Sequence, residues 1–179
     1  GDLMVRTQYM NHTALTLGYR LEADGAALVY ASDHEPFSRH LASGKGEIQG
    51  QDRRHCEFLA GADLVIHDAQ FTLNEYASKI GWGHSTVEYA IAMSREAEVG
   101  RLALTHHDPL RTDDAIDDIV RNARDDQCNM SPAFEIFAAA EGQSLELRGH
   151  DRAVTSNEAT ILNTPALATP LLLMAVKDP

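Results

Sequence analysis

The chain of 179 residues carries 27 acidic and 15 basic residues, which gives a formal net charge of −12, and 44% of its residues are hydrophobic. This composition is typical of a globular protein with its own core. The negative charge argues against passive binding to nucleic acid or to an anionic membrane, because phosphates would be repelled. Because of this repulsion, we expect a small-molecule substrate and do not favour nucleic acid. The charge still allows an enzyme that holds a phosphate through metal cations.

The cysteines and the hydropathy pattern are typical of a protein located in the cytoplasm. Cys56 and Cys128 lie far apart in polar stretches and look like free thiols rather than parts of a disulfide framework. No signal peptide is visible, and the longest apolar stretch, 167–176, contains a proline and is too short to span a bilayer. We therefore expect a cytoplasmic protein without a membrane partner. Its nine histidines are the one compositional hint of a bound metal.

The hydrophobic pattern predicts strands and helices that alternate along most of the chain. Asp24–Gly25 is typical of a hairpin turn, and Ser85 or Thr86 could cap a helix, with Glu88 completing a capping box if Ser85 is the cap. Strands are expected at 4–10, 14–21, 27–31, 62–67 and 101–105. Helices are expected at 52–59, 85–98 and 113–126, and a last pair of strands at 133–138 and 144–147, around a turn at 141–142.

This order of elements predicts an α+β domain in which helices cover sheets. We place the domain at residues 1–149. From residue 150 to 179 the sequence has short apolar clusters and no clear period. We interpret this segment as a tail or linker, or as a segment that docks onto something outside the chain.

Three candidate metal ligands lie at predicted strand ends: His12, Asp33 and His106. Imidazole and carboxylate groups are the usual nitrogen and oxygen ligands of zinc, manganese or iron. The alternative interpretation of each one is a loop side chain that is solvated or hydrogen-bonded. The sequence contains no short ligand spacing that would decide between the two.

Asp68 and His84 form a second candidate pair. A carboxylate beside an imidazole could orient the ring and raise its pKa, which would make His84 a general acid for a leaving group. The alternative is a structural pair that closes the loop at 71–83. Trp82, between two glycines, could line a pocket or only hold this loop in place.

Four segments in this order resemble the metallo-β-lactamase superfamily, and within it the ribonuclease Z-like and phosphodiesterase-like branch. Asn11–His12, followed by the strand that ends at Asp33, is similar to the third histidine motif and the bridging aspartate of that branch. The segment 63–71 with Gly83-His84-Ser85-Thr86 resembles its paired acid and His-Ser-Thr segments. The segment 101–106 resembles its last metal-ligand motif.

The resemblance implies an αββα sandwich with two divalent metal ions between its sheets, zinc first, with manganese or iron as alternatives. It implies that His12 serves the first metal, that Asp33 bridges both, and that His106 serves the second. Asp68 and His84 would then protonate the leaving oxygen. The implied activity is metal-dependent hydrolysis of a phosphodiester.

The His-x-His-x-Asp-His motif of this family is absent from the sequence. The chain therefore resembles mainly the C-terminal half of the sandwich, with one sheet face apolar and uncovered. We expect an N-terminal segment or a second chain, such as the partner in a homodimer, to complete the site, and the isolated chain to be inactive. The alternative function is a non-catalytic module of the same fold that senses a ligand or a metal.

Overall fold

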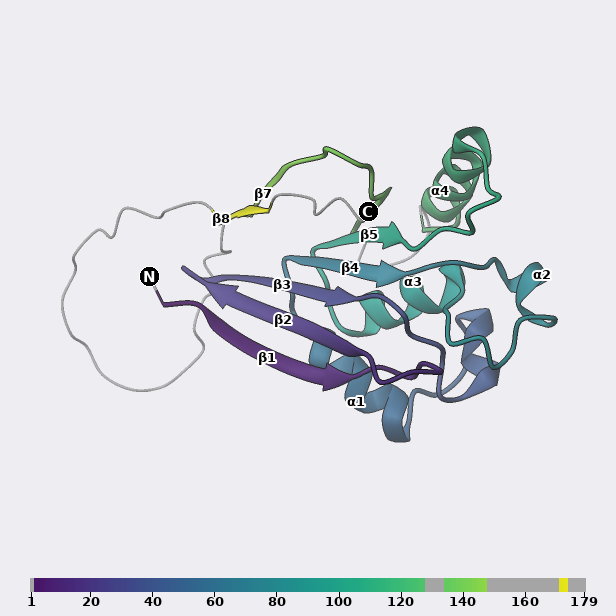
Figure 1. Cartoon of the computed structure of the whole chain (residues 1–179), viewed down its shortest axis with the longest axis horizontal. Coiled ribbons are helices and arrows are strands. Elements are labelled where there is room, and N and C mark those ends of the chain that lie inside the picture. The colour runs from purple at the N-terminus through teal and green to yellow at the C-terminus, as the bar shows by residue number, and fades with distance from the viewer. Residues whose placement is uncertain (1, 128–133, 148–170, 174–179) are drawn as a thin grey trace.

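The computed structural model describes residues 2–127, 134–147 and 171–173 (Figure 1). Its strands are β1 (Met4–Tyr9), β2 (Leu17–Ala23), β3 (Ala26–Ala31), β4 (Leu64–Asp68), β5 (Arg101–Thr105), β6 (Glu135–Ala138), β7 (Leu145–Leu147) and β8 (Leu171–Leu173). Its helices are the 3₁₀ helix η1 (Arg39–Ser43), α1 (Gly50–Leu59), α2 (Leu73–Tyr76), α3 (Val87–Glu96) and α4 (Asp113–Gln127). The mixture of one large sheet with helices confirms the α+β class.

Strands β1 to β6 form one sheet in sequence order. The first three strands are antiparallel, and β3, β4, β5 and β6 run parallel to one another. Because β1 and β3 are both antiparallel to β2, the carboxyl ends of β1, β3, β4 and β5 lie at the same edge of the sheet (Figure 1). The loops that follow these four strands therefore meet there.

The hairpin between β2 and β3 is built by its two turn residues. Asp24 and Gly25 both have positive φ, at 50° and 80°. A two-residue turn with both φ values positive matches the right-handed twist of the strands it joins. The Asp-Gly signal in the sequence therefore predicts this turn correctly, and the turn fixes the register of β2 against β3.

One face of the sheet is covered by helices. Val29, Val65, Leu102 and Ile136 follow one another across four neighbouring strands and are buried. They belong to a core cluster that also takes residues from three helices: Cys56 and Leu59 of α1, Ala90 and Met93 of α3, and Val120 and Ala123 of α4. The crossovers between parallel strands thus place their helices on one side and bury this face.

The opposite face is only partly covered in the described part of the chain. A smaller cluster, which includes Leu28, Leu64 and Leu147, covers one end of it. Nearer the site edge, the paired residues Tyr19 and Tyr30 keep 42% and 43% of their surface exposed. The two rings therefore form an exposed aromatic pair on this face. It agrees with the expectation of an apolar, uncovered face.

One local prediction was wrong, and one open alternative is decided. The strands β6 and β7 do not pair with each other: β6 pairs with β5, and β7 pairs with β8. The cap of α3 is Thr86, whose side chain accepts from the backbone amide of Tyr89. The carboxylate of Glu88 therefore closes no capping box with Ser85 and accepts from the amide of Leu73 instead.

The boundary between a domain at 1–149 and a tail at 150–179 stays a prediction. Within the second segment the structure describes only β8, which forms a two-stranded sheet with β7. Cys128 and His150 lie outside the described residues, whereas Cys56 is a buried free thiol. No helix in the described part of the chain combines the length and the apolar character that a bilayer-spanning segment needs.

Candidate metal centre

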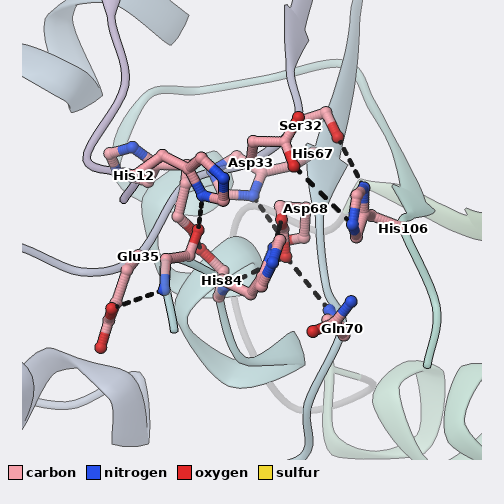
Figure 2. A network of polar contacts seen from close by, with 12 residues as sticks. His12, Ser32, Asp33, Glu35, His67, Asp68, Gln70, His84 and His106 are labelled. Carbon is pink, nitrogen blue, oxygen red and sulfur yellow. Dashed lines mark hydrogen bonds and ion pairs between the residues drawn. The ribbon is translucent and has the colours of Figure 1, made fainter. Parts of the chain in front are cut away.

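The candidate site lies where the loops after β1, β3, β4 and β5 meet, and Figure 2 shows its side chains converging. Asp33, Asp68, His84 and His106 each offer a ligand atom, and these four atoms lie within 4.8 Å of one another. The ring of His12 lies beside them, with its centroid 5.1 Å from that of His84. All five site residues predicted from the sequence are therefore neighbours in space.

Asp33 and His106 are held in an unusual backbone conformation. Their φ angles are 55° and 58°, in the left-handed region that residues other than glycine seldom adopt. Such strain persists only where the surrounding structure enforces it, and it is frequent at functional sites. Here it turns the two side chains toward each other, with 3.7 Å between Nε2 of His106 and Oδ1 of Asp33.

The three site histidines are oriented in the same way. His12 donates from Nδ1 to the carbonyl oxygen of Gly83 at 3.0 Å, and His84 Nδ1 lies 2.7 Å from Oδ2 of Asp68. His106 Nδ1 lies 3.1 Å from the hydroxyl of Ser32. In each ring the second nitrogen, Nε2, is thereby left for another partner. Metal-ligating histidines are typically held through their other ring nitrogen in this manner.

The donor set suits a divalent metal. It combines carboxylate oxygens with imidazole nitrogens, which zinc, manganese and iron accept. The site is also mixed in exposure, since Asp68 is fully buried while the side chains of His106 and Asp33 keep 36% and 33% of their surface exposed. A substrate could therefore reach the cluster from one side. These residues fit the metals that the resemblance implies.

Asp68 is fixed by its surroundings, and it fixes His84 in turn. Its carboxylate accepts from the backbone amides of Gln70 and Ser85 as well as from the His84 ring. Burial alone would lower the pKa of His84, but the hydrogen bond and charge of Asp68, with the charges of Asp33 and Glu35, outweigh it and raise the pKa. The pair can therefore act as a proton donor, or as an oriented ligand with its carboxylate behind it.

Glu35 organises the loop before His84, and the sequence gives no sign of this. Its buried carboxylate accepts from the hydroxyl of Tyr76 at 2.7 Å and from the amides of Gly81 and Gly83 at 2.7 and 2.9 Å. Its backbone is also bonded to Asn11, the neighbour of His12. Glu35 thus ties together the loops that carry His12, Asp33 and His84.

Behind the site lie three fully buried histidines that the sequence analysis also missed. His34 accepts from the amide of Asn11 at Nδ1, so its Nε2 donates to the hydroxyl of Tyr89, 3.3 Å away. His67 donates from Nδ1 to the carbonyl of Asp68, and its Nε2 therefore accepts from His55 at 3.0 Å. Burial, the largest effect, lowers the pKa of each of these rings. They are neutral packing groups that support the loops carrying Asp33 and Asp68.

Comparisons with known proteins identify the family. The family model described as "Beta-lactamase superfamily domain" matches residues 5–107. A ribonuclease Z of Haloferax volcanii is 30% identical over 128 residues, which are 69% of this chain and 32% of that protein. A ribonuclease Z of Shouchella clausii is 43% identical over 49 residues, 27% of this chain and 16% of that protein.

Solved structures show the same fold. The metallo-β-lactamase fold protein YhfI from Bacillus subtilis superposes with a TM-score of 0.54 at 20% identity, covering 78% of this chain and 47% of that one. The short form of human tRNase Z gives 0.50 at 18% identity, covering 76% and 40%. The chain thus spans less than half the length of each of these four proteins.

Proposed function

Because the chain belongs to the metallo-β-lactamase superfamily, in its ribonuclease Z-like branch, we propose that it carries one side of the active site of a metal-dependent phosphodiesterase. The observation that carries this proposal is the convergence of Asp33, Asp68, His84 and His106 within 4.8 Å. The relatives named above are ribonucleases, which argues against leaving nucleic acid out of the candidate substrates. A phosphodiester is the chemistry common to RNA and to the small molecules first expected.

We assign His12, Asp33 and His106 to the metal and propose two divalent ions, zinc first. Bound there, these ions would supply a nucleophilic hydroxide and neutralise charge on the phosphoryl oxygens. His106 and His12 would bind through Nε2, because Nδ1 of each is engaged by Ser32 and by Gly83. These three residues cannot fill two coordination shells, so the complete site needs further ligands from a longer chain or from a partner, such as a second copy in a homodimer.

We propose that Asp68 and His84 together protonate the leaving group. The buried Asp68 carboxylate holds Nδ1 of His84 and favours the protonated ring, so Nε2 can deliver a proton to the departing oxygen. The direct contact of this pair with the metal residues also allows a ligand role. A cytoplasmic location remains part of the proposal and is supported by the buried free thiol of Cys56.

The test is hydrolysis of bis-p-nitrophenyl phosphate by the gene product that contains this chain. We expect turnover that is lost with a chelator and restored by zinc or manganese. His84→Ala should lower kcat by about 10²- to 10⁴-fold with metal content unchanged, the usual contribution of a general acid. His40→Ala, at an exposed position in η1, is the control and should keep full activity.

Hydrolysis that does not depend on metal would contradict the proposed function. Metal binding without any hydrolysis would favour the second candidate, a metal- or ligand-sensing module of the same fold. The observation that supports this second candidate is the incomplete set of metal donors within the described residues.

A further inference from the structure

Trp82 is exposed beside the site in a loop that holds it there. It is the only tryptophan of the chain, and 54% of its surface is open to solvent. It lies two residues before His84, and its ring packs edge-on against Phe71, whose own ring centroid is 6.2 Å from that of His84. A large aromatic side chain is usually buried, so its exposure at the rim of a site calls for a reason.

The loop around Trp82 is held in place by hydrogen bonds of its backbone amides. The amides of the flanking residues Gly81 and Gly83 both donate to the buried carboxylate of Glu35, and the amide of Trp82 itself donates to the carbonyl of Lys79 at 3.1 Å. Both glycines have positive φ, at 87° and 91°. The indole is therefore presented outward by a fixed backbone, which lowers the entropy cost of binding a ligand to it.

A positive charge is part of the same surface. The ammonium nitrogen of Lys79 lies 3.8 Å from the centroid of the Trp82 ring and 5.8 Å from that of Phe71. A cation thus lies over the indole ring, while 54% of the surface of Trp82 stays exposed. An aromatic surface with a cation at its side recognises a flat ring that is attached to an anion.

We propose that Trp82 and Lys79 form a subsite for a nucleobase carried by the phosphoester that reacts at the neighbouring cluster. Trp82 stacks on the base, and Lys79 pairs with an oxygen of the attached phosphate. This inference rests on the proposed phosphodiesterase function for its purpose, but binding at the subsite needs neither metal nor turnover. Trp82 and Lys79 determine substrate preference and take no part in proton transfer.

The experiment follows the fluorescence of Trp82, taken as the difference between the gene product that contains this chain and its Trp82→Leu variant, with a chelator present. Adenosine 5′-monophosphate should quench Trp82 in a saturable manner, whereas ribose 5-phosphate, which lacks the base, should not. Lys79→Ala should weaken nucleotide binding about tenfold. Lys45→Ala removes a lysine from another exposed loop and should leave binding unchanged. Equal responses to the two phosphates, or no quenching at millimolar nucleotide, would overturn the subsite.

A second measurement separates this inference from the proposed function. In the active gene product, Trp82→Leu should raise KM for thymidine 5′-monophosphate p-nitrophenyl ester about tenfold and leave methyl p-nitrophenyl phosphate unaffected. Loss of activity on both esters alike would contradict the subsite while the phosphodiesterase stands. Quenching by nucleotide in a protein without hydrolysis would retain the subsite and remove the phosphodiesterase.

Discussion

At the scale of single residues, the site depends on a glycine as much as on its charged groups. Gly83 accepts the Nδ1 proton of His12 on its carbonyl oxygen, and its φ is 91°. A Cβ at this position would overlap with Nδ1 of His12. The glycine therefore lets the loop approach the ring closely enough to set which nitrogen of His12 is free.

Gly83→Ala should weaken zinc binding about tenfold or more, because the added methyl group displaces His12, and loss of a partner that orients a metal-binding histidine typically costs 10- to 100-fold. Gly81→Ala is the matched control, since Gly81 has a similar φ of 87° but open space around the added atom. Both affinities can be measured by calorimetric titration with zinc. If both variants lose zinc equally, backbone strain in the loop is responsible, and contact with His12 is not.

The residues of the candidate site could be found from the sequence because they follow apolar runs. His12, Asp33 and His106 come directly after predicted strands, where parallel topology collects side chains at one edge. Glu35 and His34 follow the same strand and were not assigned any role. Their partners, Gly83 and Tyr89, are 48 and 55 residues away, so no local pattern connects them.

At the scale of elements, the sequence predicts strands and helices well and pairing less well. The buried strands β4 and β5 and the acidic helix α4 come within two residues of the expected ranges. The pairing of β6 with β7 was wrong because a turn at 141–142 is a local signal, whereas the parallel pairing of β6 with β5 depends on α4 crossing between them. The sequence also could not decide which residue caps α3, because Ser85 and Thr86 are both suitable N-cap residues.

Thr86→Ala should lower the free energy of unfolding by about 0.5–2 kcal/mol, the usual cost of losing an N-cap. The Thr86 hydroxyl also donates to the carbonyl of Ala42 at 2.6 Å and so links α3 to η1. Thr112→Ala at the start of α4 is the comparison, because its contact with the Ala115 amide is exposed and 3.4 Å long. Denaturant titration should place Thr86→Ala well below Thr112→Ala in stability; the reverse order would contradict this account of the α3 cap.

At the scale of the whole molecule, the core contains buried polar rings on the side next to the candidate site. Three histidine rings are buried between the sheet and the helices, next to the loops of the site. Burial lowers the pKa of each ring below the ordinary value near 6.5, so the folded protein keeps them neutral. The unfolded chain takes up protons that the folded protein does not. The contribution of these three neutral rings to stability is therefore fully present above about pH 6.5 and is lost as the pH falls below it.

His55→Gln should make this loss shallower, by up to about 1.4 kcal/mol per pH unit, because one buried ring no longer titrates on unfolding. The measurement is the free energy of unfolding between about pH 6.5 and 5, from denaturant titrations at each pH. His40→Gln, at an exposed position, should leave the slope unchanged. A wild-type stability that does not fall over this range would contradict the neutral histidine cluster.

The sheet face that carries Tyr19 and Tyr30 is open to solvent at these two residues. The fold resemblance predicts one apolar face without a cover, and the exposed tyrosines agree with it. The sequence alone could not place this face, because alternation along β2 and β3 shows only that each strand has two sides. The register between strands puts both tyrosines on the same side.

The most direct test of the metal centre is a zinc titration of the gene product that contains this chain and of three single-substitution variants of it. The account predicts that His106→Ala and Asp33→Asn weaken zinc binding about tenfold or more. His84→Ala should bind zinc as the unchanged protein does, because the proposal assigns its ring to the leaving group. If His84→Ala loses zinc as His106→Ala does, then His84 is a metal ligand and the assignment of Asp68 and His84 to proton transfer is wrong.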